Sequence, residues 1–196
     1  MITKSLKPLI LSILFLSLLM LIAQFFQSDL VFYRDLINTG QWWRLISGNF
    51  THSNYPHLLM NLAGLWILGF LFIDSLSLKT FLLSVTFLSL SVGFGLYLFD
   101  LDLQKYYGFS GVLYGLFLVG ASTAIVKKDY LTGIAVAIII IAKVIWDLFN
   151  GGSTSSAEII GIPVAVHAHL YGILGAIIIG AILILFKKDT PPLLHG

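Results

Sequence analysis

The chain contains no cysteine and few charged residues. The absence of Cys among its 196 residues excludes disulfide bridges, thiolate metal sites and a cysteine nucleophile. Charged residues make up only 10% of the chain, whereas soluble domains carry about 25%. The net charge is +2 and no long basic run occurs, so nucleic acid is not an expected partner. A surface this poor in charge is not that of an ordinary domain in water.

The chain contains several long hydrophobic runs. Hydrophobic residues make up 58% of the chain, and its mean hydropathy is +0.98. A helix needs about 20 mostly apolar residues to cross a hydrocarbon core of about 30 Å, and these runs lack the alternation of barrel strands. We therefore expect an all-α integral membrane protein with a single domain over residues 1–190 and a tail at 191–196. Six spans are predicted, at 8–26, 57–73, 80–98, 110–126, 131–149 and 167–186.

The basic residues predict how these spans are oriented. The first run is longer than the apolar part of a signal peptide and lacks a small-x-small cleavage site, so we expect it to be retained as a helix. An N-terminus in the cytoplasm places seven basic residues inside and three outside, which favours an N-in/C-in topology. The inner residues are Lys4, Lys7, Lys79, Lys127, Lys128, Lys187 and Lys188, and the outer ones are Arg34, Arg44 and Lys105.

Three segments then face outward, at 27–56, 99–109 and 150–166. The first carries several aromatic residues, and we expect it to be partly helical and to lie at the membrane interface. Residues 151–156 are rich in Gly and Ser and predict a flexible loop.

Ser110 begins the fourth predicted span, after Gly108 and before Gly111. A helix start offers unpaired N–H groups and the positive end of the helix dipole, which favour an oxyanion beside the serine. The flanking glycines allow a substrate chain to approach closely. Seventeen residues rise about 25 Å, so the start of this helix can lie below the outer surface. Taken alone, a serine here is more often an ordinary N-cap.

His169 lies near the outer start of the sixth predicted span. Gly172 and Ala176 give that helix a small face, and Gly111 and Gly115 give the fourth helix a matching one. Packing of these faces brings the serine and the histidine to the same depth, where imidazole can take the serine proton at neutral pH. A lone histidine in a helix is more often structural, so the hypothesis depends on the pair.

His57 and Asn61 share one face of the second predicted span, at positions i and i+4. Both can donate hydrogen bonds to a developing oxyanion. Two alternatives stay open, a polar contact between helices and a metal site that adds His52. No acidic ligand lies near this pair in the sequence, so we expect no metal, and we expect no other cofactor.

The sequence places no acidic residue where it would complete a triad. Asp100 and Asp102 fall in an outer segment, and Asp147 falls near the outer end of the fifth span, four residues after Lys143. We therefore expect a Ser–His dyad. Lys143 is interpreted first as the partner of an ion pair within its helix. The alternative is contact with a substrate carboxylate or a lipid phosphate, with Trp146 as an interfacial anchor or part of a substrate gate.

Four ordered motifs resemble those of the rhomboid intramembrane proteases. They are Trp43-Arg44, His57-x-x-x-Asn61, Gly108-Phe109-Ser110-Gly111 and Ala168-His169-x-x-Gly172. The resemblance implies a six-helix bundle in which Ser110 is the nucleophile and His169 the base. It implies an oxyanion hole formed by His57, Asn61 and the Ser110 backbone N–H. It also implies that Tyr114, one turn after the serine, packs against the catalytic histidine.

A finer resemblance is to the rhombosortase branch of that family. It covers residues 50–61, 142–146 and 167–172. That branch is bacterial and processes C-terminal sorting tails, which combine a Gly-Gly motif, a hydrophobic helix and a basic end. The resemblance implies cleavage of transmembrane substrates at the periplasmic face of an inner membrane, with lipids as the other partner. His167 departs from the acidic residue expected there, and its role stays open.

Two rivals of the protease hypothesis remain. A catalytically inactive rhomboid-like protein would bind transmembrane helices without cutting them. Inactive relatives usually lose the serine or the histidine, whereas this chain keeps both Ser110 and His169. A small transporter would show an inverted repeat or broken helices, and the sequence shows neither. Whether the acyl-enzyme passes to water or to another nucleophile is not decided by the sequence.

Overall fold

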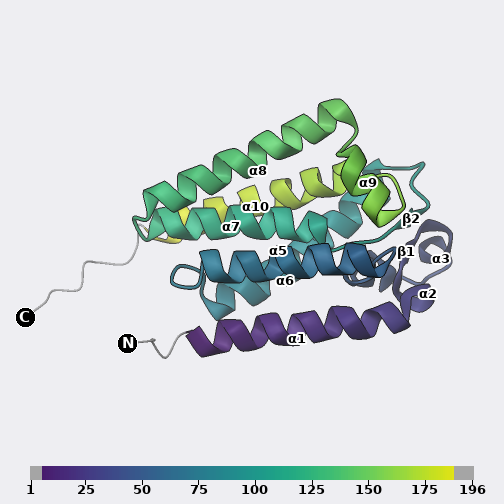
Figure 1. Ribbon diagram of the computed structural model, residues 1–196, viewed down its shortest axis with the longest axis horizontal. Coiled ribbons are helices and arrows are strands. Elements are labelled where there is room, and N and C mark those ends of the chain that lie inside the picture. Colours follow the sequence, from purple (N-terminus) through teal and green to yellow (C-terminus); the bar gives the residue numbers. More distant parts are fainter. Residues whose placement is uncertain (1–5, 188–196) are drawn as a thin grey trace, which may run out of the picture.

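In the computed structural model, which describes residues 6–187, six long helices run side by side (Figure 1). They are α1 (Leu6–Phe25), α5 (Tyr55–Leu71), α6 (Leu78–Phe99), α7 (Ser110–Val126), α8 (Tyr130–Asn150) and α10 (Val166–Lys187). Each coincides with one predicted span, and no end differs by more than two residues. Lys4, Lys188 and the predicted tail at 191–196 lie outside the described residues, as does the predicted domain end at 190.

Four of these helices, α1, α6, α8 and α10, are long and apolar enough to cross a membrane. The apolar helices α5 and α7 have 17 residues each and are shorter. Large side chains project outward from the bundle, for example Phe15, Leu131 and Phe149, which are 68%, 85% and 86% exposed. Contiguous apolar surface of this extent is costly in water and favourable in lipid. The chain therefore has the architecture of an integral membrane protein.

Helix α7 runs through the interior of the bundle and packs closely on α10. A Cβ atom added to Gly172 would lie 1.9 Å from the Gly111 carbonyl oxygen, and one added to Gly111 would lie 2.7 Å from the Ala168 oxygen. Larger residues at these positions would push the helices apart, so the glycines allow backbone-to-backbone contact. The predicted packing of two small faces is confirmed.

Helix α8 is packed more loosely. Only 17% of its span is buried, compared with 50% for α6. It lies against α7 at its start and leans away toward its end (Figure 1). Its three buried residues are Gly133, Val144 and Asp147.

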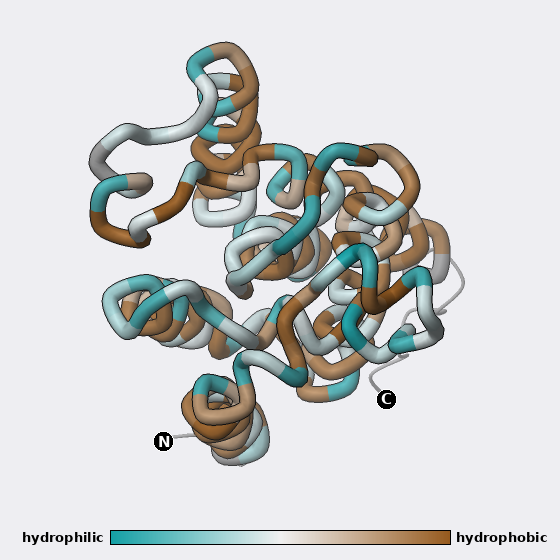
Figure 2. Tube along the Cα trace, turned by 90° about the vertical axis from the view of Figure 1, so that its right-hand side faces the viewer, coloured by the Kyte–Doolittle hydropathy of each residue, from teal (hydrophilic) through white to brown (hydrophobic). Residues whose placement is uncertain are grey.

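The short elements gather at one end of the bundle, which Figure 2 views end-on. They are α2 (Gln27–Leu30), β1 (Phe32–Tyr33), α3 (Arg34–Asn38), α4 (Arg44–Ser47), the 3-10 helix η1 (Gly48–Phe50), β2 (Lys105–Tyr106) and α9 (Thr154–Ile160). The segment 27–56 is thus partly helical, as predicted. Strands β1 and β2 form an antiparallel pair, with Phe32 opposite Tyr106, which the sequence analysis did not predict.

The structure corrects one predicted loop. Residues 151–156 were expected to be flexible, but α9 begins at Thr154. Gly151 and Gly152 have φ angles of +69° and +90°, and they turn the chain at the end of α8. The Ser153 hydroxyl then accepts a hydrogen bond from the Ser156 N–H and caps the new helix. The same Gly and Ser residues that suggested flexibility end one helix and start the next.

Candidate active site

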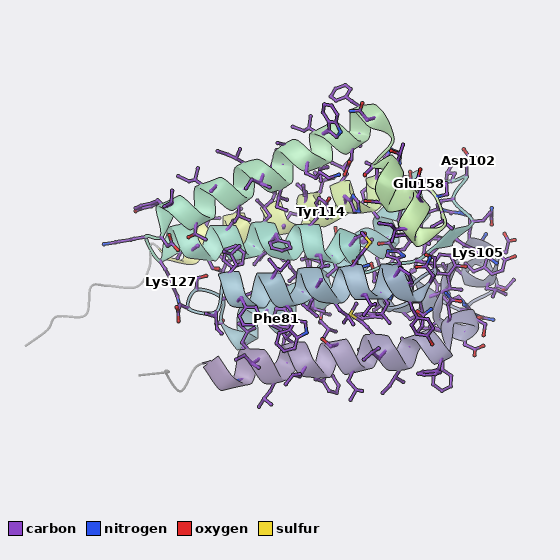
Figure 3. The ribbon with its side chains drawn as sticks, viewed as in Figure 1. Phe81, Asp102, Lys105, Tyr114, Lys127 and Glu158 are labelled. Carbon is purple, nitrogen blue, oxygen red and sulfur yellow. The ribbon has the colours of Figure 1, made fainter. Side chains whose placement is uncertain are left out.

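The residues predicted as nucleophile, base and oxyanion donors meet at a cavity of about 300 Å³ inside the bundle. Its walls come from α5, α7, α8, α9 and α10, and the polar residues that line it include His57, Asn61, Ser110, Lys143, Asp147 and His169. Figure 3 shows Tyr114, another lining residue, inside the bundle, with Asp102, Lys105 and Glu158 at one end and Lys127 at the other. Apolar residues such as Leu113, Phe117 and Ile140 complete the walls.

Ser110 and His169 are in hydrogen-bond contact. The Ser110 Oγ lies 3.0 Å from the His169 Nε2, although 59 residues separate them in the chain. The glycine contacts between α7 and α10 bring the two helices close enough for this distance. His169 is only 5% exposed. The predicted pairing at one depth is therefore confirmed, and the contact suits transfer of the hydroxyl proton to the imidazole.

Tyr114 fixes the plane of the His169 ring. The two rings stack with centroids 4.2 Å apart and planes 12° from parallel. Tyr114 lies one turn after Ser110 on α7, so the helix that carries the serine also orients the histidine. The expected packing of this aromatic residue is observed.

One carboxylate lies near the histidine, which was not expected from the sequence. Asp147 Oδ2 is 3.9 Å from His169 Nδ1, and the Asp147 side chain is 1% exposed. Its other oxygen, Oδ1, accepts from the Lys143 ammonium, as the predicted i, i+4 ion pair requires. The sequence placed Asp147 near the outer end of its helix but gave no sign that this face of α8 turns toward α10.

His57 and Asn61 lie beside the backbone that leads into Ser110. A Cβ added to Gly108 would lie 2.7 Å from His57 Nε2 and 3.9 Å from Asn61 Nδ2. Gly108 has a φ of +117°, which disfavours other residues, so its small size and its conformation both bring the chain past these side chains. Asn61 Nδ2 also donates to the His57 carbonyl at 3.1 Å.

Ser53 defines which nitrogen of His57 carries a proton. The Ser53 hydroxyl donates to the Ile160 carbonyl at 2.6 Å, because a carbonyl can only accept. Its oxygen therefore accepts from His57 Nδ1, which lies 3.1 Å away. In the neutral ring Nε2 then has a lone pair and no proton, so it becomes a donor only when the ring is protonated.

Helix α9 is attached to the start of α5 above the cavity. Besides the Ser53 contact, the Asn54 side-chain amide donates to the Ile159 carbonyl at 3.0 Å. Asn54 also caps α5, since its Oδ1 accepts from the His57 N–H at 2.8 Å. Neither Ser53 nor Asn54 was predicted to belong to the site, although an Asn directly before an apolar run is a recognisable N-cap signal.

Strand β2 supports the entry into α7. The Tyr106 hydroxyl donates to the Gly108 carbonyl at 2.7 Å. Burial raises the pKa of Tyr106, so this hydroxyl keeps its proton and remains a donor. A second hollow of about 460 Å³, lined by Lys105, Tyr106, Ser110 and His57 among others, reaches the serine from this end of the molecule.

His52, the residue that could join His57 in a metal site, lies beside His57. Its ring is fully buried, lies edge-on to that of His57 with centroids 5.0 Å apart, and has no hydrogen-bond partner on either nitrogen. Burial, and then the neighbouring His57, lower the pKa of His52 to about 3. Over residues 6–187, no group of three or more His, Asp or Glu side chains is arranged to hold a metal ion.

The remaining predicted residues lie away from the cavity. Arg44 is 3% exposed and donates to the Ser28 and Val31 carbonyls at 3.0 and 2.8 Å, and the Trp43 indole donates to the Asp29 carbonyl. These two residues thus hold the outer segment together. Trp146 and His167 also lie outside the cavity lining.

Trp146 is 64% exposed and is absent from the cavity lining. His167 does not line the cavity either, and its Nδ1 lies 2.5 Å from Asp100 Oδ1. That contact joins the start of α10 to the end of α6.

Comparison with known proteins gives one result. A family model described as "Rhomboid domain" matches residues 39–186, which cover most of the chain and every residue that lines the cavity. The search of curated proteins returned no match.

Proposed function

The chain belongs to the rhomboid family, and we propose that it is an intramembrane serine endopeptidase. The family consists generally of intramembrane serine proteases. The observation that carries the proposal is the 3.0 Å contact between Ser110 Oγ and His169 Nε2 at a cavity of about 300 Å³ that both residues line. A serine and a histidine with a structural role only would need no such cavity beside them.

In the proposed reaction, Ser110 Oγ attacks the carbonyl carbon of a peptide bond while His169 Nε2 takes the hydroxyl proton. The histidine then gives this proton to the leaving amine, and the acyl group stays on the serine. Water, activated by the same histidine, hydrolyses the ester and restores the enzyme. The hollow lined by Tyr106 and Lys105 offers a route for that water.

The oxyanion is held by donors around Gly108. Asn61 Nδ2 and the Ser110 backbone N–H, which is free of the helical ladder at the first position of α7, supply two hydrogen bonds. His57 adds a third through Nε2 once its ring is protonated, because Ser53 already occupies Nδ1. A developing negative charge favours that protonation.

The proposed substrates are transmembrane helices that enter from the bilayer. We propose six spans in an N-in/C-in topology, with the end that carries α9 at the periplasmic face of a bacterial inner membrane. The proposed target is a C-terminal sorting tail with a Gly-Gly junction, as in the rhombosortase branch. Glycine disfavours helix by about 1 kcal/mol against alanine, so such a junction unwinds easily beside Ser110. An alternative last step is transfer of the acyl group from Ser110 to a nucleophile other than water.

The test is cleavage of a reporter in proteoliposomes. The reporter carries a Gly-Gly junction before a transmembrane helix, and a matched reporter carries Ala-Ala. We expect wild-type protein to cut the first, and Ser110→Ala to lower the rate to background, a loss on the order of 10³-fold or more. Ser122→Ala, on the same helix α7 with its hydroxyl bonded to the Leu118 carbonyl, is the matched serine control. His169→Ala and His167→Ala form the equivalent histidine pair on α10.

Two outcomes would contradict the proposal. Cleavage at the wild-type rate by Ser110→Ala would exclude the serine as nucleophile. Failure of a fluorophosphonate to label Ser110, together with binding of the reporter without cleavage, would instead favour the inactive rhomboid-like protein. A preference for Ala-Ala over Gly-Gly would leave the protease assignment intact and overturn the sorting-tail substrate.

A further inference from the structure

We propose that Asp147 is a positioning residue that orients His169 through Nδ1 and so supports the Ser110–His169 pair. The inference rests on the proposed function and concerns the same site. It starts from two buried atoms without hydrogen-bond partners, Asp147 Oδ2 and His169 Nδ1. These two atoms face each other at 3.9 Å.

The contact of His169 with Ser110 decides where the imidazole proton lies. To take the serine proton, Nε2 must carry a lone pair, and the single proton of the neutral ring is then on Nδ1. A buried N–H needs an acceptor, and buried donors are almost always paired. The acceptor that Nδ1 faces is Asp147 Oδ2.

A small movement closes the contact. A hydrogen bond between N–H and oxygen spans about 2.7–3.2 Å, so the observed separation is too long by roughly 1 Å. Tyr114 holds the plane of the imidazole, while α8 is the loosely packed helix. We therefore expect the Asp147 side chain, and not the imidazole, to move. Catalytic hydrogen bonds often reach their short distance only when substrate is bound.

Lys143 binds one oxygen of the Asp147 carboxylate and leaves the other free. The ammonium binds Oδ1, so Oδ2 remains available to the histidine. Before the reaction, the positive Lys143 and the negative Asp147 balance each other. When the serine attacks, His169 becomes positive and the oxyanion negative, so the cluster stays neutral overall. An ion pair that served only to stabilise α8 would not require the second oxygen to face the imidazole.

Two measurements on the full-length protein in liposomes test the proposal. In the wild type, ¹⁵N NMR of labelled histidine should show His169 protonated on Nδ1, with the signal assigned by its loss in His169→Gln. This spectrum needs no substrate. In the cleavage assay, Asp147→Asn should lower kcat by about 100-fold and change KM by less than about twofold, because an amide can stabilise the wrong tautomer. Asp147→Glu should recover part of the rate.

Asp102→Asn removes an equal charge at the outer end and should retain the wild-type kcat. Wild-type kcat in Asp147→Asn, or a His169 protonated on Nε2 in the wild type, would overturn the inference. If Asp147→Asn does not fold, the wild-type spectrum still decides through the Nδ1 proton, because a hydrogen bond to a carboxylate moves its signal far downfield and an unpaired N–H keeps an ordinary shift. Failure of the proposed function looks different, since the wild type would then cut no reporter and Ser110 would take no phosphonate label.

Discussion

Helices α10 and α8 pack on α7 in opposite ways. Helix α10 meets α7 backbone to backbone, so that a Cβ on Gly172 would lie 1.9 Å from the Gly111 carbonyl oxygen. Helix α8 comes as close at its start, where a Cβ on Gly133 would lie 2.7 Å from the Ala121 oxygen, and then leans away (Figure 1). The space that this divergence leaves contributes to the cavity with Ser110.

The difference separates two tasks within one site. The distance between Ser110 and His169 is set by backbone contacts, which allow little adjustment. We call the side of α7 from which α8 diverges the open side. Asp147 on α8 and the segment α9 lie on this side, and side-chain contacts that can shift hold them in place. A membrane protease needs both properties, because its nucleophile and base must stay in register while a substrate helix enters.

Gly172→Ala should have the largest effect, because it disturbs the close contact between α7 and α10. The added methyl group would overlap the Gly111 carbonyl, so α7 and α10 must separate. We expect a loss of about 1–3 kcal/mol in stability from overpacking. We also expect kcat to fall on the order of 100-fold, because a displacement near 1 Å at the reacting groups can cost this much. Thermal unfolding in detergent and the cleavage assay measure the two effects.

Gly180→Ala, on the same helix α10, is the matched control. A Cβ there would approach the Ser122 hydroxyl at 3.0 Å, and that hydroxyl can rotate away. We expect nearly wild-type stability and rate. Equal rates in Gly172→Ala and the wild type would show that the α7–α10 contact does not set the Ser110–His169 distance.

The tightly packed side is also the one that the sequence predicts best. Hydrophobic runs locate all six long helices, and small residues at helical spacing identify the faces of α7 and α10 that meet. Ser110 and His169 follow from that packing, because both lie at the start of their helices. These are local patterns, in which neighbours along one helix determine the face.

The open side depends on contacts that no local pattern specifies. The Asp147 contact with His169 arises from the tilt and rotation of α8, which follow from its packing against α7 and α10. The Ser53 contact with Ile160 joins residues 107 positions apart. Prediction therefore treated Asp147 as half of a local ion pair and residues 151–156 as a loop, since sequence spacing reveals i, i+4 neighbours but not helix rotation.

A smaller effect is expected from the bridge that joins α9 to the start of α5. Ser53→Ala removes the hydroxyl that joins His57 Nδ1 to the Ile160 carbonyl. We expect kcat/KM to fall about tenfold, because the His57 ring loses the contact that holds it at Nδ1 and the buried Ile160 carbonyl is left without this donor. Ser53→Thr keeps the hydroxyl and should retain most of the rate. A wild-type rate in Ser53→Ala would mean that neither His57 nor α9 depends on this bridge.

The smallest effect is expected at Trp146, on the lipid-facing side of α8. The side chain is 64% exposed and does not line the cavity, although Asp147 next to it does. Adjacent helical residues point about 100° apart, so the indole points away from the cavity that Asp147 lines. We expect Trp146→Ala to keep kcat and KM within about twofold, measured in the same liposomes. A marked change in KM alone would instead make this indole part of the substrate gate, and the open side would then extend around α8 to its outer surface.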